Sequence, residues 1–204
     1  MYEVTLFDHD FLEMMKSIAG EGVLNAADGF SGMIGRQIRV SSPAVKLVPV
    51  LTIPQVVGKP DEDAVGVYLR FHGNLAGQIM LIIPHGKAME LADLIMGNAP
   101  GTTRQLGSLE RSALGELGNL CGSFFLNTVA KLFDLGIHPS PPAVMVDMVA
   151  AILDIVVATM EGISEQALLF QANFVDGDRR VDTDFWVIPD LNSLQALAGK
   201  NLKS

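Results

Sequence analysis

Two side chains capable of chemistry stand three residues apart in the stretch ALGELGNLCG, residues 113–122: Glu116 and Asn119. The apolar and glycine residues around them predict a helix packed on a core. A polar group buried there without a partner costs roughly 1–3 kcal/mol. At about 100° per residue, Ser112, Glu116, Asn119 and Ser123 share one narrow stripe. The sequence therefore predicts an outward row of polar side chains on a rigidly held helix, as a site requires.

The other sides of this helix indicate how it is held. Apolar residues take the opposite side: Leu114, Leu117, Cys121, Phe124, Phe125 and Leu132. Gly115, Gly118 and Gly122 form a third strip. A glycine costs a helix roughly 1 kcal/mol relative to alanine, so we expect another backbone to approach closely along this strip.

Composition narrows the class of protein. Of 204 residues, 49% are apolar and 18% charged, which allows a sizeable core and argues against disorder. The net charge of −9 excludes nucleic-acid binding through general electrostatics. The single cysteine, Cys121, fits a reducing compartment, and the N-terminus has no pattern of a secretory signal. We expect a cytoplasmic protein.

The apolar segment 143–160 resembles a membrane span but carries Asp147 and Asp154. Each acid would cost about 2.5–3.5 kcal/mol at the centre of a bilayer. The segment instead predicts a helix of a soluble protein with an acidic stripe, and no membrane association. By sequence alone, this stripe is either a solvated edge or a docking surface.

Periodicity and turn residues divide the chain into elements. Helices are predicted at 10–35, 86–97, 108–133, 143–160 and 191–200, and strands at 37–40, 44–53, 64–71, 76–84, 166–175 and 183–189.

This order of elements occurs twice. An offset of 99 residues places Met15 on Leu114, Ile18 on Leu117, and the stretch PAV at 43–45 on PAV at 142–144. The offset also aligns the β-rich residues 44–48 with the start of the helix predicted at 143–160, so one of these two predictions is wrong.

We therefore predict an α+β fold, a pseudo-two-fold repeat of helix, strands and helix that forms one antiparallel-rich sheet with long helices packed on it. The chain would be a single domain, 1–204, made of two pseudo-repeats at about 8–100 and 107–200. The same offset puts Glu116 on Ser17 and Asn119 on Gly20. A structural role for the polar pair would be expected in both halves, so its presence in one half favours chemistry.

Other chemistries find little support in the sequence. Residues 29–32, GFSG, do not complete a nucleophile elbow, and Cys121 lies near the apolar side of its helix. The four histidines are scattered without metal-ligand spacing, so each is interpreted as a surface or loop residue and no metal site is predicted. No glycine-rich phosphate cradle is present.

The full pattern resembles that of CheC, the chemotaxis phosphatase group that also includes CheX and the phosphatase part of FliY. That pattern is Asp or Ser, three residues, Glu, two residues, Asn, 22 residues and Pro, which Ser112, Glu116, Asn119 and Pro142 satisfy. The likeness runs from NAADGFSGMI in the first helix through PPAVMVDMVAAILD. Many CheC proteins resemble two-site enzymes, and the first site is degenerate here.

The resemblance implies a phosphatase for the aspartyl phosphate of a CheY-type response regulator. The regulator would supply Mg²⁺ and a lysine, so no cofactor of the chain's own is expected. Asn119 would position a water, because a carboxamide donates and accepts hydrogen bonds at once. Glu116 would dock and orient the regulator, Ser112 would be accessory, and Pro142 would shape the backbone behind the site.

The resemblance also implies a second partner. In CheC proteins the segment matching 143–160 binds CheD, the receptor glutamine deamidase, and an acid matching Asp147 matters there. CheX-like relatives dimerise instead. Two functions therefore remain open: a phosphatase with one intact site, or a weakly catalytic or non-catalytic adapter that binds CheD or a regulator.

Overall fold

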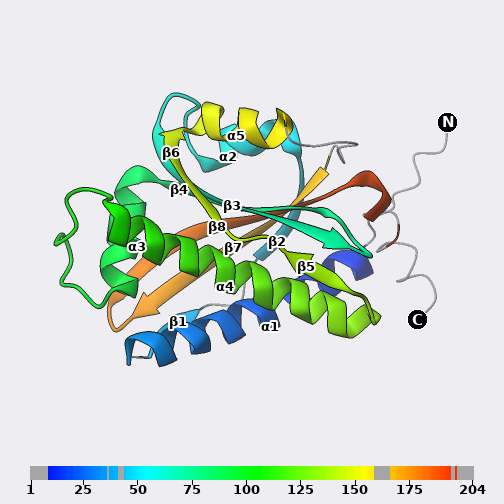
Figure 1. Cartoon of the computed structure of the whole chain (residues 1–204), viewed down its shortest axis with the longest axis horizontal. Helices are drawn as coiled ribbons and strands as arrows, with labels where there is room; N and C mark the ends of the chain where they lie inside the picture. The colour runs from blue at the N-terminus through cyan, green and yellow to red at the C-terminus, as the bar shows by residue number, and fades with distance from the viewer. Residues whose placement is uncertain (1–8, 36, 41–43, 159–165, 194–195, 197–204) are drawn as a thin grey trace.

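The computed structural model describes residues 9–35, 37–40, 44–158, 166–193 and 196 (Figure 1). Its elements in chain order are α1 (His9–Ile34), β1 (Arg39–Val40), β2 (Ala44–Pro49), the 3₁₀ turn η1 (Val50–Thr52), α2 (Ile53–Val57), β3 (Asp63–Gly73), β4 (Gly77–Pro84), α3 (His85–Ile95), α4 (Ser108–Phe133), β5 (Ile137–Pro139), β6 (Ala143–Met148), α5 (Val149–Ala158), β7 (Gln166–Asp176) and β8 (Arg179–Pro189).

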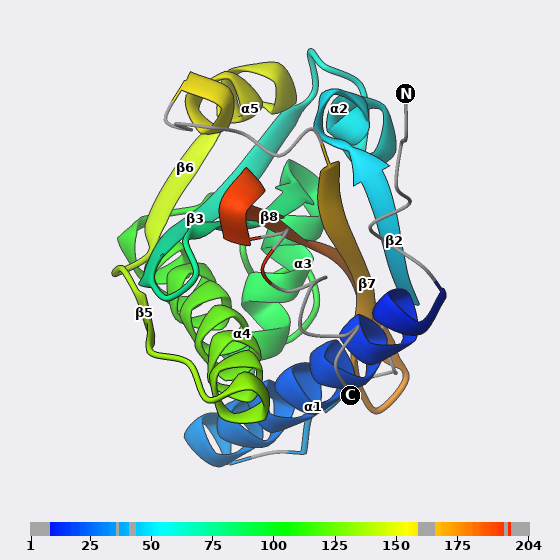
Figure 2. The same cartoon turned by 90° about the vertical axis from the view of Figure 1, so that its right-hand side faces the viewer.

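The strands of the described residues form one antiparallel sheet in the order β1-β7-β8-β4-β3-β5, with β2 also paired to β7 and β6 to β3. The neighbours β4 and β8 lie at its centre. The edge strand of each half pairs with a long strand of the other half, and Figure 2 shows β2 and β6 at opposite sides of the molecule. The predicted class, an α+β fold with an antiparallel sheet and long helices, is confirmed.

Alternation along the strands builds two cores, one on each face of the sheet. On β3, Val65, Val67 and Leu69 face α1, α3 and α4, whereas Ala64 packs in the cluster under α2 and α5. Helices therefore cover both faces, with α2 and α5 above the sheet and α1 and α4 below it in Figure 1. The helix α4 is thus supported on one side by the sheet and exposed on the other.

The two halves match closely in their element bounds. Helices α1 and α4 each have 26 residues and begin 99 residues apart, and so do the six-residue strands β2 and β6. These bounds agree with the predicted offset, while the division of the domain at about 8–100 and 107–200 stays a prediction. Residues 41–43, which include the counterpart of Pro142, lie outside the described part of the chain.

The glycine strip of α4 packs on side chains of the sheet, which corrects the expectation of a neighbouring backbone. A Cβ on Gly115 would lie 3.1 Å from Val144 Cγ2, and one on Gly118 would overlap Val67 Cγ1. The close approach of two backbones occurs instead on α1, where a Cβ on Gly22 would lie 3.0 Å from the Cα atom of Phe125. Leu132, assigned to the apolar side, is 57% exposed.

The prediction of a helix at 143–160 was wrong for its first six residues. Residues 143–148 form strand β6, which pairs with β3 from Asp63 to Tyr68. Helix α5 begins only at Val149, whose N–H donates to the carbonyl of Glu62 at 3.0 Å. Pairing with β3 outweighs the local periodicity, and it removes Asp147 from the helical stripe.

The remaining predictions fare better. The strands and helices expected elsewhere are present. One of them is shorter than predicted: the strand expected at 44–53 ends at Pro49, and the chain then forms η1 and α2. There Val50 and Ile53 turn into the core under α5. The predicted terminal helix at 191–200 lies mostly outside the described residues. In the part of the chain that the structure describes, no helix combines the length and the apolarity needed to cross a membrane.

Candidate functional site

Helix α4 carries the predicted polar stripe on its partly exposed side. Ser112 is exposed, whereas Glu116, Asn119 and Ser123 are half-buried. The residues that hold the helix from behind, Leu114 and Leu117, are fully buried. The stripe therefore sits on a helix whose opposite side is fixed in the core, which limits the motion of the polar side chains.

A buried carboxylate fixes the loop that leads into α4. Asp93, 1% exposed at the end of α3, accepts hydrogen bonds from the backbone N–H groups of Thr102 and Thr103 at 3.0 and 2.9 Å. Burial opposes ionisation of Asp93, but hydrogen bonds from Thr103, Gly101 and Thr102 together hold its pKa below the ordinary value. The start of α4 is thereby tied to α3.

Glu116 and Asn119 make few contacts within the protein. Ser123 Oγ lies 3.5 Å from Asn119 Oδ1, the outer limit of a hydrogen bond. Among the described residues, no group pairs with the Glu116 carboxylate or accepts from the Asn119 amide nitrogen. Both groups are therefore available to a water molecule or to a partner protein.

Pro142 lies against α4 at Gly115, although 22 residues separate it from Asn119 in the sequence. Its Cγ atom would be 4.0 Å from a Cβ on Gly115, the residue just before Glu116. The absence of a side chain at Gly115 lets the segment from Pro142 to Val144 lie directly against α4. The structure thus brings Pro142 next to Gly115, the residue before Glu116 in the chain, and Ser112 lies one turn before Glu116 on the helix.

The matching face of α1 differs in chemistry and in shape. Ser17 is exposed, and Gly20 has open space around the position of a Cβ. Where α4 has Gly115, α1 has Lys16, which is exposed and forms an ion pair with Glu13 at 3.5 Å. A groove of about 360 Å³ runs along this face and is lined by Lys16, Ser17 and Gly20. The two faces are therefore not equivalent sites.

The exchange of Gly115 for Lys16 was missed by reasoning from the sequence. The 99-residue offset pairs these two positions. The contact of Gly115 with Val144 and Pro142 shows why the difference between them matters: a side chain at position 115 would press against the segment from Pro142 to Val144. Comparison of every glycine in the second helix with its counterpart in the first would have revealed it.

Asp147 is exposed on β6, opposite Ala64 of β3. Its Oδ1 atom accepts a hydrogen bond from the N–H of Met148 at 2.8 Å. The residue is therefore on the strand that directly follows Pro142, and it lies two residues before the start of α5.

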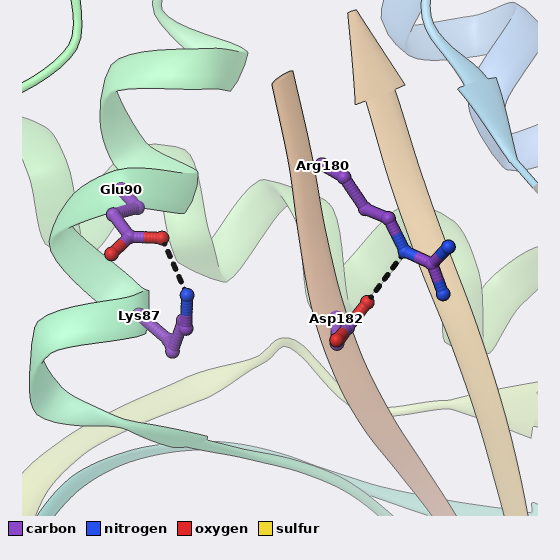
Figure 3. A network of polar contacts seen from close by, with 4 residues as sticks. All are labelled: Lys87, Glu90, Arg180 and Asp182. Atoms are coloured by element: carbon purple, nitrogen blue, oxygen red, sulfur yellow. Dashed lines mark hydrogen bonds and ion pairs between the residues drawn. The ribbon is translucent and has the colours of Figure 1, made fainter. Parts of the chain in front are cut away.

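Other candidate groups give no further catalytic site. Burial raises the pKa of the Cys121 thiol to about 12, in line with its predicted place in the core. Within the described ranges no three His, Cys, Asp or Glu side chains are grouped to hold a metal. Figure 3 shows two exposed ion pairs, Lys87–Glu90 at 2.8 Å and Arg180–Asp182 at 3.1 Å. Such exposed pairs contribute about 0–1 kcal/mol to stability.

Comparison with known proteins gives a consistent result. The model of the CheC-like family matches residues 109–146, which cover most of α4 and the strand β6 up to Val146. The CheY-P phosphatase CheC of Bacillus subtilis (strain 168) is 24% identical over 190 residues, 91% of each chain. The crystal structure of FliY from Thermotoga maritima has a TM-score of 0.74 at 18% identity and covers 97% of this chain and 98% of that one.

A more distant structure contains a partner protein. The complex of CheX with CheY, BeF₃ and Mg²⁺ from Borrelia burgdorferi gives a TM-score of 0.50 at 16% identity, covering 83% of this chain and 96% of the matched one. At these identities the solved structures establish the shared fold, and the relative from B. subtilis connects that fold with a phosphatase of CheY-P.

Proposed function

We propose that this chain, a member of the CheC, CheX and FliY family, hydrolyses the aspartyl phosphate of a CheY-type response regulator at a single site on α4. The observation that carries the proposal is the pair Glu116 and Asn119. Both are partly exposed, Glu116 has no partner among the described residues, Asn119 meets only Ser123 Oγ at 3.5 Å, and the helix beneath them is held in the core.

The chemistry demands little of the phosphatase. An acyl phosphate is already activated, and the regulator would supply Mg²⁺ and a lysine of its own. The remaining tasks are to orient a water in line with the phosphorus atom and to hold the partner. A carboxamide such as that of Asn119 can donate one hydrogen bond and accept another, so it orients a water without being consumed.

Glu116 would serve the second task. Its carboxylate stands one turn before Asn119 and has no ion pair within the described chain, so it can pair with a cationic side chain of the regulator. Ser112 extends the same row by one more turn, and Pro142 forms the wall beside Gly115. In this proposal Asn119 is catalytic, Glu116 docks the partner, and Ser112 and Pro142 are accessory.

Release of inorganic phosphate from a phosphorylated CheY-type regulator, with and without the protein, tests this proposal. We expect the protein to accelerate release at substoichiometric concentration. Glu116→Lys should raise the regulator concentration needed for half-maximal rate more than it lowers the maximal rate, because it inverts the docking charge. Glu21→Lys, the same change at an exposed position of α1, is the control and should behave as the parent. A Glu116→Lys protein with normal binding and lost turnover would refute the docking role.

One observation favours a second, adapter function. The helices α2 and α5 form one layer, which connects to the sheet through η1 and the end of β6. This region contains five of the nine large apolar side chains that are exposed among the described residues: Leu51, Val56, Met148, Ile155 and Val157. Exposed apolar side chains that gather in one region mark protein-binding surfaces. Asp147 and Asp154 are exposed in the same region. By its resemblance to CheC, we propose a CheD-type deamidase as the partner.

A titration with a CheD-type protein tests the adapter function. Asp147→Lys should weaken binding at least about tenfold, as expected when an interface charge is inverted, and should leave phosphate release nearly unchanged. Asp178→Lys, on the turn between β7 and β8, makes the same charge change away from this layer and should bind as the parent does. Equal affinity of the Asp147→Lys variant and the parent would remove this surface from the account.

A further inference from the structure

Two histidines that are distant in the sequence meet at one end of the sheet. His72 of β3 and His138 of β5 are direct partners in the antiparallel register, between the pairs Phe71–Pro139 and Gly73–Ile137. Both side chains are exposed, and their ring centres are 5.8 Å apart with an interplanar angle of 45°. Both are surface residues, as interpreted from the sequence, but this pair is not scattered, because strand pairing brings the two together.

Backbone hydrogen bonds hold the two strands together on either side of the histidine pair. On one side of the pair, the N–H of Asn74 donates to the Gly136 carbonyl at 2.8 Å, and the N–H of Gly136 donates to Asn74 Oδ1 at 2.7 Å. On the other side, the N–H of Ser140 donates to the Arg70 carbonyl at 2.7 Å, and the N–H of Arg70 donates to Ser140 Oγ at 3.0 Å. The pair is therefore flanked by hydrogen-bonded backbone in both directions.

The spacing of the rings suits a shared metal ion. A nitrogen ligand lies about 2.0–2.1 Å from Zn²⁺, so each ring centre lies about 3 Å from the ion and two ring centres on one tetrahedral ion lie roughly 5–6 Å apart. The observed separation of 5.8 Å falls in this range. Imidazole nitrogen is a preferred ligand of Zn²⁺, Ni²⁺ and Cu²⁺.

We propose that His72 and His138 together chelate a divalent transition-metal ion of the Zn²⁺, Ni²⁺ or Cu²⁺ class, with water completing its coordination. The bound ion would link β5 to β3. Since β5 leads within three residues to Pro142, the ion would also restrain the segment that lies against α4. This inference does not depend on the proposed phosphatase activity.

Arg70 raises an alternative, a site for an anion instead of a metal ion. It lies two residues before His72 on β3, so its side chain emerges on the same face of the sheet, and it is exposed. A guanidinium beside two imidazoles could bind an anion such as inorganic phosphate, whereas it would repel a cation. Removal of Arg70 therefore separates the two ligands: metal binding should hold or tighten in Arg70→Ala, while binding of phosphate would weaken.

Calorimetric titration of the full, untagged chain with ZnCl₂ and with NiCl₂ tests the proposal. We expect about one ion per chain in the parent. In His72→Gln and in His138→Gln the affinity should fall by more than about 100-fold, the upper end of what loss of a supporting group costs. His85→Gln, at a partly exposed histidine that begins α3, is the matched control and should keep the parental affinity.

Thermal unfolding with and without metal provides a second readout. The unfolding midpoint of the parent should rise with Zn²⁺, because a ligand that binds only the folded state stabilises it. This rise should vanish in His72→Gln and in His138→Gln. Without metal, the midpoints of both variants should match that of the parent. Absence of binding in the parent, or equal binding in the His72→Gln, His138→Gln and His85→Gln variants, would overturn the proposal. Phosphate binding by the parent that is lost in Arg70→Ala, without metal binding, would reassign the cluster to an anion.

Discussion

Helices α1 and α4 have the same length and matching places in the two halves, but they differ in how they meet their edge strands. On α4, Gly115 allows Pro142 and Val144 to lie against the helix that carries Glu116 and Asn119. On α1, the ion-paired Lys16 replaces this glycine, and Ser17 and Gly20 replace the polar pair. The two helix faces thus differ in their packing against the edge strand as well as in the two polar side chains.

The first half also shows that the fold persists without these features. The buried side of α1 keeps its apolar residues, with Met15 and Ile18 at 1% and 3% exposure, while its outward face has changed. The two helices therefore share their apolar side and differ on their outward side. The predictions below probe that difference, from the largest expected effect to the smallest.

The glycines of the two helices should respond in opposite ways to a single methyl group. A Cβ at Gly118 would overlap Val67 Cγ1 in the core, so Gly118→Ala should lower the free energy of unfolding by about 1–3 kcal/mol. Gly20→Ala adds a methyl in open space and should raise it by up to about 1 kcal/mol through helix propensity. Urea unfolding of the two variants measures both values. A stable Gly118→Ala protein would show that α4 can move on the sheet.

Restoring the missing pair tests whether the first half retains the frame of a site. Ser17→Glu with Gly20→Asn, placed in an Asn119→Ala background, should recover part of the phosphate release, because Gly20 has room for a side chain. Adding Lys16→Ala should increase the recovery for two reasons. Lys16 would repel the lysine of the regulator, and it would neutralise the carboxylate introduced by Ser17→Glu. Phosphate release by the double and the triple variant measures the two contributions.

Two outcomes would contradict this account of the first half. An unfolded Gly20→Asn protein would mean that position 20 is buried, against the open space found there. Equal recovery in the double and triple variants would remove Lys16 from the explanation and leave the edge strand as the remaining difference.

A smaller contrast concerns the central strands. β4 is apolar from Ile79 to Ile83, whereas β8 carries the half-buried Asp184, which accepts a hydrogen bond from Gln171 Nε2 at 3.2 Å. Burial raises the pKa of Asp184, the neighbouring Asp182 adds to the rise, and Gln171 opposes it. The folded state then binds this proton more tightly than the unfolded state, so stability falls as the pH rises from the ordinary pKa through the raised one.

Asp184→Asn should therefore remove this part of the pH dependence. Its free energy of unfolding should exceed that of the parent slightly at pH 7 and lose the advantage at low pH, where the parental carboxyl is protonated. Urea unfolding at several pH values measures the difference, with the exposed Asp178→Asn as the control. A variant that is less stable than the parent at pH 7 would show that the carboxylate is favourable where it stands.

Much of this arrangement could be predicted because it depends on local pattern. The bounds of α4 follow from its apolar period, and its polar stripe follows from the positions of Ser112, Glu116 and Asn119. Residues 143–148 could not be assigned in this way, since their acidic spacing also fits a helix and only pairing with β3 makes them a strand. The offset between the halves contained the correct answer, because it aligned these residues with a segment predicted as a strand.

Contacts between distant segments account for what was missed. The approach of Pro142 to Gly115 and the meeting of His72 with His138 depend on the order of strands in the sheet. Strand order is set by the whole domain, so neither pair has a signal in a short window of sequence. The roles of Glu116, Asn119, Ser112, Pro142 and Asp147, the absence of a cofactor and the cytoplasmic location remain predictions.

The most direct test of the central claim compares two asparagines of α4. Phosphate release from a phosphorylated CheY-type regulator should be accelerated by the parent and by Asn127→Ala, whose exposed side chain lies two turns beyond Asn119 on the same helix. Asn119→Ala should give no acceleration while its free energy of unfolding stays within about 0.5 kcal/mol of the parental value. A folded Asn119→Ala protein that releases phosphate at the parental rate would contradict the account.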